Sequence, residues 1–160
     1  MEFHPLPQPE EISLREREDA MGAYFMMFAS LAAGLPLPFL NIVASVIYYY
    51  VNKKTGRFVQ YHSMHALISH IPVAIVNTIA VVWGFLIIFY DYYMNINFKA
   101  FVAMSIVANL VYIVYSIIAA VKAHKGRFYY FWFFGKLSYI AIFKVKEESI
   151  NEGPVNRSPL

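Results

Sequence analysis

The chain alternates between long uncharged stretches and short charged segments. Residues 20–51, 71–90 and 100–121 contain no Asp, Glu, Lys or Arg over 32, 20 and 22 positions. A helix needs about 20 apolar residues to cross the hydrocarbon core of a bilayer. The pattern therefore predicts an all-α integral membrane protein, with the stretches supplying its membrane helices.

The first stretch is too long for one upright crossing, because 32 residues of α-helix would measure about 48 Å. It contains Pro36 and Pro38, and prolines end or kink a helix. We favour two short helices, at about residues 20–34 and 38–52, that form a hairpin broken at Pro36–Pro38. This gives a bundle of four helices, and one long kinked helix, with three spans in total, is the alternative.

The remaining segments complete a single membrane domain. Residues 1–19 predict a polar leader and the start of a surface helix, residues 20–143 the helical membrane domain, and residues 144–160 a polar tail. A helix that begins at about residue 58 is expected to kink near Pro72 and then cross the bilayer. Residues 128–143 are rich in aromatic side chains but too short and mixed for a span, so they predict an interfacial segment.

Basic residues follow the first and third stretches, and they predict the orientation. Lysines and arginines gather in cytoplasmic loops of membrane proteins, which places residues 52–62 and 122–127 inside and residues 91–99 outside. With the hairpin, and with Arg15 and Arg17 near the start of the chain, both termini are cytoplasmic. The small net charge of +3 gives no sign of nucleic-acid binding, and the absence of cysteine excludes disulfides and thiolate metal sites.

Polar side chains within the apolar stretches recur at spacings of 4, 3 and 4, which places each set on one helix face. One set is Asn41, Ser45, Tyr48 and Asn52, and the other is Ser105, Asn109, Tyr112 and Ser116. We interpret both polar stripes as hydrogen-bonding contacts between helices, each worth about 0.6 kcal/mol. A hydrated path lined by the same side chains, as in a small transporter or channel, is the alternative.

Three histidines stand near the start of the second long helix: His62, His65 and His70. His62 and His65 share a face, but a zinc site usually has three or four His, Cys or carboxylate ligands, and no acidic residue within the membrane stretches supplies the rest. We therefore expect no metal, no cofactor, no small-molecule substrate and no enzymatic activity. A redox subunit that binds a cofactor through these histidines is a second alternative.

Two segments carry a family resemblance. Residues 57–72 open a helix with an aromatic and histidine-containing run, in which Gln60 stands where the family has Arg and His65 where it has Gln. Residues 119–137 end a helix with small residues and continue through basic, glycine and aromatic positions, with Trp132 where proline is common. Together they resemble the family of the twenty-kilodalton membrane subunit of the chloroplast inner-envelope import translocon (the Tic complex) and its small bacterial relatives.

The resemblance covers about residues 24–138 and implies four helices with both termini inside. It also implies a non-enzymatic multi-pass subunit of a larger assembly linked to protein translocation or membrane-protein biogenesis, with the lipid bilayer and other membrane subunits as partners. A chain that starts with polar, acid-rich residues rather than a transit peptide favours a bacterial inner membrane. The motif residues expected to dock a partner are Arg57, Phe58, Val59, Tyr61, His62, Met64, His65, Ala66, Gly126, Gly135 and Lys136.

Overall fold

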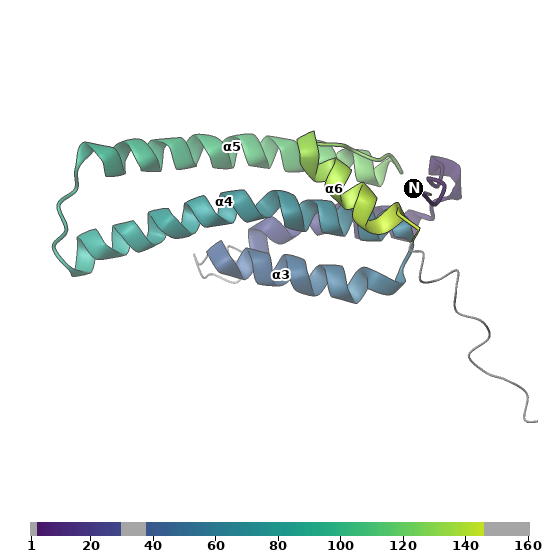
Figure 1. Ribbon diagram of the computed structural model, residues 1–160, viewed down its shortest axis with the longest axis horizontal. Coiled ribbons are helices and arrows are strands. Elements are labelled where there is room, and N and C mark those ends of the chain that lie inside the picture. Colours follow the sequence, from purple (N-terminus) through teal and green to yellow (C-terminus); the bar gives the residue numbers. More distant parts are fainter. Residues whose placement is uncertain (1–2, 30–37, 146–160) are drawn as a thin grey trace, which may run out of the picture.

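The computed structural model describes residues 3–29 and 38–145, and these ranges form helices joined by short connections (Figure 1). Five α-helices are present in them: α1 (Leu14–Phe25), α3 (Pro38–Val51), α4 (Arg57–Phe89), α5 (Ile96–His124) and α6 (Trp132–Phe143). Three short 3-10 helices accompany them: η1 (Pro9–Glu11), η2 (Met26–Phe28) and η3 (Asn52–Lys54). The predicted all-α class is confirmed for the described part of the chain.

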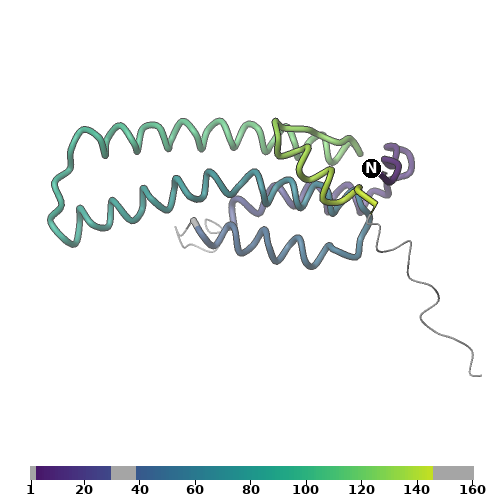
Figure 2. Tube along the Cα trace, in the orientation of Figure 1, coloured from purple at the N-terminus to yellow at the C-terminus, as the bar shows by residue number. Residues whose placement is uncertain are grey.

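The two longest helices, α4 and α5, form an antiparallel hairpin along the whole molecule (Figures 1 and 2). They contain 33 and 29 residues, which corresponds to lengths of about 50 and 43 Å. The loop of residues 90–95 joins them at one end, which we call the far end. At the opposite end lie the N-terminal segment, the turn at residues 52–56 and the connection after α5; we call this the basic end.

α1 and α3 are antiparallel and cover only the half of the α4–α5 hairpin nearest the basic end (Figure 1). The Tyr48 hydroxyl of α3 donates to the Asp19 carbonyl of α1 over 2.8 Å. About one turn earlier in α1, Glu16 lies beside Gly56, the residue that precedes α4. This is the arrangement expected of the predicted hairpin. Its predicted tip, Pro36–Pro38, lies outside the described residues, apart from the Pro38 backbone with which α3 begins.

α1 starts six residues earlier than the predicted first membrane helix. Its first turn is stabilised by a reciprocal capping box, in which the Glu16 amide donates to Ser13 Oγ over 3.3 Å and the Ser13 amide donates to Glu16 Oε2 over 3.1 Å. The predicted surface helix and the first apolar helix are therefore one continuous element. With 12 residues in α1 and 14 in α3, each of these helices measures only about 18–21 Å.

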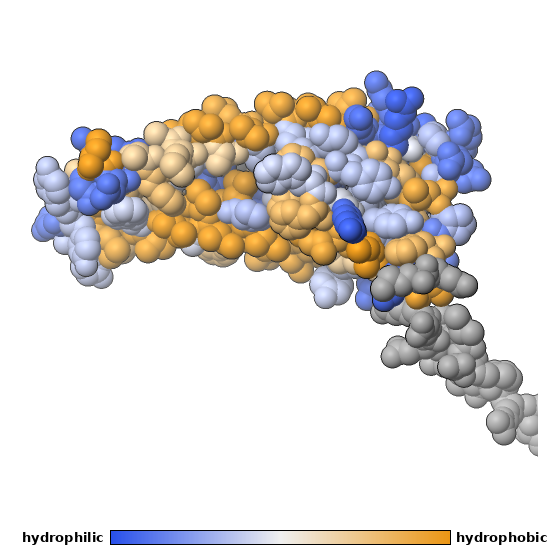
Figure 3. All heavy atoms as spheres, turned by 45° about the horizontal axis from the view of Figure 1, so that its top comes forward, coloured by the Kyte–Doolittle hydropathy of each residue, from blue (hydrophilic) through white to orange (hydrophobic). Residues whose placement is uncertain are grey.

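α4 and α5 expose most of their apolar surface. Only 6% of the most apolar window of α4 and 22% of that of α5 are buried within the protein, whereas the core helix of a soluble protein is mostly buried. Figure 3 shows hydrophobic side chains over the middle of the molecule and polar ones gathered at both ends. Both helices are long and apolar enough to cross a bilayer. α4 is one continuous helix through Pro72.

After α5 the chain reverses at Gly126. Its φ of +69° is a backbone conformation that glycine adopts without strain. The Gly126 amide donates to the Ala123 carbonyl and the Arg127 amide to the Lys122 carbonyl, each over 2.9 Å, which is the Schellman helix ending. This pair of bonds terminates α5 and sends the following residues back along the bundle.

The aromatic C-terminal segment forms a second, smaller hairpin. Residues 127–131 run back along the bundle and α6 then returns towards the basic end, packed on α4 (Figures 1 and 2). The Tyr61 hydroxyl donates to the Tyr129 carbonyl over 2.8 Å, which satisfies a polar group of this non-helical stretch. At its end, the His4 amide donates to the Phe143 carbonyl over 2.8 Å. The segment is too short to span, as predicted, but it is folded onto the bundle.

Gly135 permits this small hairpin to close, and its substitution tests the packing. A Cβ at Gly135 would lie 2.7 Å from the backbone Cα of Tyr130, so we expect Gly135→Ala to destabilise the protein by about 1–3 kcal/mol. A Cβ at Gly84 would lie 3.8 Å from Phe98, and Gly84→Ala is expected to be neutral or stabilising by up to about 1 kcal/mol. Unfolding free energies measured in detergent check both, and equal effects would contradict this packing.

Candidate functional site

The most concentrated polar chemistry of the interior lies where α1, α4 and α5 meet near the basic end. It consists of Tyr24 of α1, His62 and His65 of α4, and Tyr115 of α5, which we call the Tyr–His cluster. Their side chains are 3%, 0%, 0% and 5% exposed. His62 and His65 are three positions apart, so they lie one above the other on the same face of α4. That face is turned towards α1, which brings both imidazoles to one hydroxyl group.

The hydrogen bonds of the cluster join the three helices through two phenols, Tyr24 of α1 and Tyr115 of α5. Tyr24 Oη lies 2.9 Å from His62 Nδ1 and 2.9 Å from His65 Nδ1. On the other side of the His65 ring, Nε2 lies 2.8 Å from Tyr115 Oη. A phenol has one proton to donate, so Tyr24 can donate to only one of the two imidazoles. Where it does so and accepts an N–H from the other, the two histidines carry their protons on different ring nitrogens.

Aromatic rings enclose the cluster. The Phe58 ring meets the His62 ring edge-on at 4.5 Å, and Phe128 stacks on His62 at 5.9 Å. Tyr61 stacks on His65 at 5.7 Å. In such apolar surroundings a hydrogen bond is strong and an unpaired polar group is costly. The cluster is therefore both a fastening between helices and a set of donor atoms shielded from water.

Most residues expected to dock a partner lie in the protein core. Phe58, Val59, Tyr61, His62, His65 and Ala66 are buried, as are Gly126 and Gly135. The reason is that α1, α3 and α6 cover the first turns of α4. Only Arg57 and Lys136 are exposed, and Met64 is half-buried. The accessible docking surface predicted at residues 57–66 is thus an internal packing surface, and a partner could reach it only by displacing these helices.

The polar stripe on α5 faces the protein. Ser105, Tyr112 and Ser116 are buried and Asn109 is half-buried. Asn109 and Asn77 of α4 exchange two hydrogen bonds: Asn77 Nδ2 donates to Asn109 Oδ1 over 3.0 Å, and Asn109 Nδ2 donates to Asn77 Oδ1 over 2.7 Å. This amide pair fixes the register of α4 against α5 in the middle of both apolar helices.

The polar stripe on α3 bonds mainly to its own helix. Ser45 Oγ donates to the Asn41 carbonyl over 2.8 Å, and Asn52 Nδ2 donates to the Tyr48 carbonyl over 3.0 Å. Ser105 of α5 likewise bonds to the Phe101 carbonyl four residues before it. The bond from Tyr48 to Asp19 does reach another helix. Serine and asparagine side chains can satisfy themselves on a carbonyl one turn away, and for this reason regular spacing alone does not predict a contact between helices.

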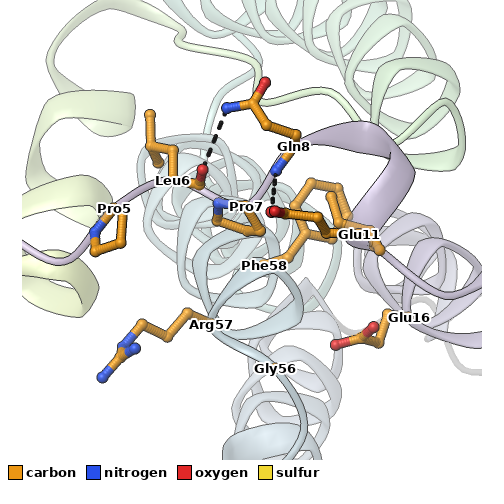
Figure 4. A pocket seen from close by; sticks show the side chains of 10 residues that line it. Pro5, Leu6, Pro7, Gln8, Glu11, Glu16, Gly56, Arg57 and Phe58 are labelled. Atoms are coloured by element: carbon orange, nitrogen blue, oxygen red, sulfur yellow. Dashed lines mark hydrogen bonds between the residues drawn. The ribbon is translucent and has the colours of Figure 1, made fainter.

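A pocket of about 410 Å³ lies at the basic end, between the N-terminal segment and the start of α4 (Figure 4). Glu11 Oε2 accepts from the Gln8 amide over 2.8 Å within its wall, and Glu16 is engaged in the capping box of α1. The Arg57 side chain points away from Glu16 in Figure 4. Both carboxylates of the lining thus bond to the backbone of local turns, and the pocket shows no convergent set of catalytic groups among its described residues. The sequence carried no signal for it.

The three histidines named above do not form one site. His70 is 4% exposed, and its ring packs against Tyr112 at 5.4 Å instead of joining the cluster. Within residues 3–29 and 38–145, no three His, Cys, Asp or Glu side chains gather closely enough to hold a metal ion. The cluster instead contains tyrosines, which are Tyr24 and Tyr115. Sequence reasoning missed both, because the approach of α1 and α5 to α4 is a tertiary contact.

The family model of the magnetosome magnetite crystal formation proteins (MamF/MmsF) matches residues 18–138. This range includes most of α1, all of α3, α4 and α5, and the first part of α6, and thus every residue of the Tyr–His cluster. The chain belongs to this family. No curated protein and no solved structure matches the sequence.

Membership of the MamF/MmsF family overturns the translocon resemblance. Both segments that suggested it, residues 57–72 and 119–137, lie within the matched range. In the structure their residues pack the core and end a helix. Phe58, Tyr61 and His62 fill the core, and Gly126 ends a helix. Buried aromatic residues and a glycine after the last turn of a helix are common features of packed helices. They are therefore not specific to one family. The translocon family assignment is therefore wrong, and the match gives no support to a link with protein translocation.

The Asn77–Asn109 pair gives a quantitative test of the hairpin. We expect Asn77→Ala and Asn109→Ala to show a coupling free energy of about 0.6–1.7 kcal/mol in a double-mutant cycle, because each amide satisfies the other in an apolar setting. As the control, Asn77→Ala combined with Ser105→Ala is expected to be additive within about 0.5 kcal/mol. Unfolding in mixed detergent provides the energies. Additivity of the two asparagine substitutions would show that the pair does not form.

Proposed function

We propose that this chain is a non-enzymatic, multi-pass subunit of the magnetosome membrane that acts in magnetite crystal formation together with other membrane proteins. The observation that carries the proposal is the family match over residues 18–138. It covers most of the helical bundle and leaves out the N-terminal segment, the first turn of α1, the end of α6 and the tail. The match therefore rests on the helices that the proposal assigns to the membrane.

The exposed apolar surface supports the membrane half of the proposal. Along α4 and α5 the outward side chains are aliphatic or aromatic, including Ile75, Val82, Val107 and Val114, each about half exposed. Contiguous apolar surface of this extent is avoided in water and is satisfied by lipid or by other membrane helices. Inside the bundle, several polar side chains bond across helices, as Tyr24 does with His65 and Asn77 with Asn109, whereas His62 Nε2 and both ring nitrogens of His70 are buried without a hydrogen-bond partner among the described residues.

Charge placement supports an orientation. Exposed Lys53, Lys54, Arg57, Lys122, Lys125 and Arg127 gather at the basic end, whereas Asp91 and the tyrosines beside it lie at the far end. By the positive-inside tendency, the basic end faces the cytoplasm, together with the N-terminal segment and the end of α6. The far-end loop of residues 90–95 then faces away from the cytoplasm.

The orientation can be tested with single cysteines, since the chain contains none. Tyr93→Cys at the far end and Lys54→Cys at the basic end replace exposed side chains. In intact isolated magnetosome vesicles, whose outer face is the cytoplasmic one, a membrane-impermeant thiol reagent is expected to label Lys54→Cys and to spare Tyr93→Cys until the membrane is opened. The reverse pattern would invert the assigned orientation, and labelling of both in closed vesicles would remove the spanning hairpin.

The functional test is restoration of crystal growth. In a magnetite-forming bacterium that lacks the gene, wild-type chain is expected to restore crystal size, measured by electron microscopy. Ala20→Phe, which places a large ring at a fully buried contact of α1, is expected to restore it poorly. Val107→Phe is the control, because Val107 is 60% exposed and faces away from the bundle.

Two outcomes would contradict the proposal. Unchanged crystals in the deletion strain would remove the role in crystal formation. A tagged chain that is recovered from magnetosome membranes in mild detergent as a lone, pure monomer would remove the assembly.

A further inference from the structure

We propose that the Tyr–His cluster binds one divalent transition-metal ion through Tyr24 Oη, His62 Nδ1 and His65 Nδ1. Phenol oxygen and imidazole nitrogen are donors that iron, zinc and cobalt all accept. That the resident ion is ferrous iron rests on the proposed function in forming an iron oxide. The site itself rests on the geometry of three donor atoms from two helices.

The three donor atoms already converge. Each Nδ1 is 2.9 Å from the phenol oxygen. Around a tetrahedral ion with bonds of about 2.0–2.1 Å, neighbouring donors stand about 3.3 Å apart. In each phenol–imidazole pair the two donors must therefore spread by only about 0.4 Å to admit an ion, a shift of the size that rotation of the Tyr24 and histidine rings provides.

The ion takes the place of the shared proton. In the exchange the Tyr24 O–H bond breaks, its proton leaves to water, and the phenolate oxygen and both Nδ1 lone pairs bond to the metal. No oxidant or reductant is needed. The phenolate reduces the charge of a divalent ion from +2 to +1, which lowers the cost of holding it among buried side chains. Both histidines can then carry their protons on Nε2.

The surroundings of His65 match a metal site. A metal-bound histidine usually gives its other N–H to an acceptor, which fixes the ring and its tautomer. Tyr115 Oη lies 2.8 Å from His65 Nε2 and can accept that proton. Since Tyr24 comes from α1 and the histidines from α4, a bound ion would fasten the first helix to the long hairpin.

Co²⁺ alone is the probe, because its visible absorption reports the ligands around it. We expect the full chain, purified in mild detergent and stripped with chelator, to bind one Co²⁺ with new absorption bands and a raised Tm. Tyr24→Phe and His65→Gln are expected to weaken binding by about 100-fold or more, since even loss of an outer partner costs about 10–100-fold. His70→Gln is the control, because that buried histidine lies outside the cluster and should leave Co²⁺ binding unchanged.

The outcomes separate the proposals. A folded wild-type chain that takes up no Co²⁺, or one whose binding survives Tyr24→Phe, would overturn the metal site and show the cluster to be a hydrogen-bond fastening only. The titration of the wild-type chain tests the metal site without any variant. A variant that fails to fold therefore leaves this test unaffected. If the wild-type chain binds no Co²⁺ yet restores crystals, the proposed function stands without the site. If the chain binds Co²⁺ but the crystals of the deletion strain are unchanged, the metal site stands and the proposed role in crystal formation falls.

Discussion

The bond from Tyr24 to two imidazoles of α4 is the contact on which the arrangement of this bundle depends. α4 and α5 are far longer than the helices that pack on them, and an apolar medium offers no hydrophobic drive between helices, so polar contacts and close packing decide where a short helix docks. The cluster supplies the polar contact, and Ala20, Ala23, Ala119 and Ala123 beside it supply the close approach. Together they set the position of α1, and through Tyr48 that of α3.

This docking gives the molecule two different halves. Near the basic end, α1, α3 and α6 surround the long hairpin, and the buried side chains include Tyr61, Phe58 and Phe143. Towards the far end, among the described residues, α4 and α5 pack only against each other and are held in register by Asn77 and Asn109. The rest of their surface there is apolar and exposed. The bundle belongs to the MamF/MmsF family, which is described as a family of magnetosome magnetite crystal formation proteins.

Much of the fold could be predicted from the sequence because helix formation in lipid is dictated locally. Uncharged stretches predicted the two long helices, the prolines predicted a helix that begins at residue 38, and basic residues marked the turns at one end. The helix bounds were less predictable: α1 begins at Leu14 because a capping box extends it. The family resemblance was wrong, because the family model that matches residues 18–138 is that of the MamF/MmsF proteins.

The sequence by itself determined which segments become apolar helices, because hydrophobicity and charge are properties of each segment. Only the tertiary structure decided which polar side chains meet. Spacing aligned Ser45 and Asn52 on one face, yet each bonds to its own helix, and spacing gave no reason to join Tyr24 to His62 and His65 across 38 or more residues. Such partners are chosen by how helices pack against one another, and helical periodicity does not encode that choice.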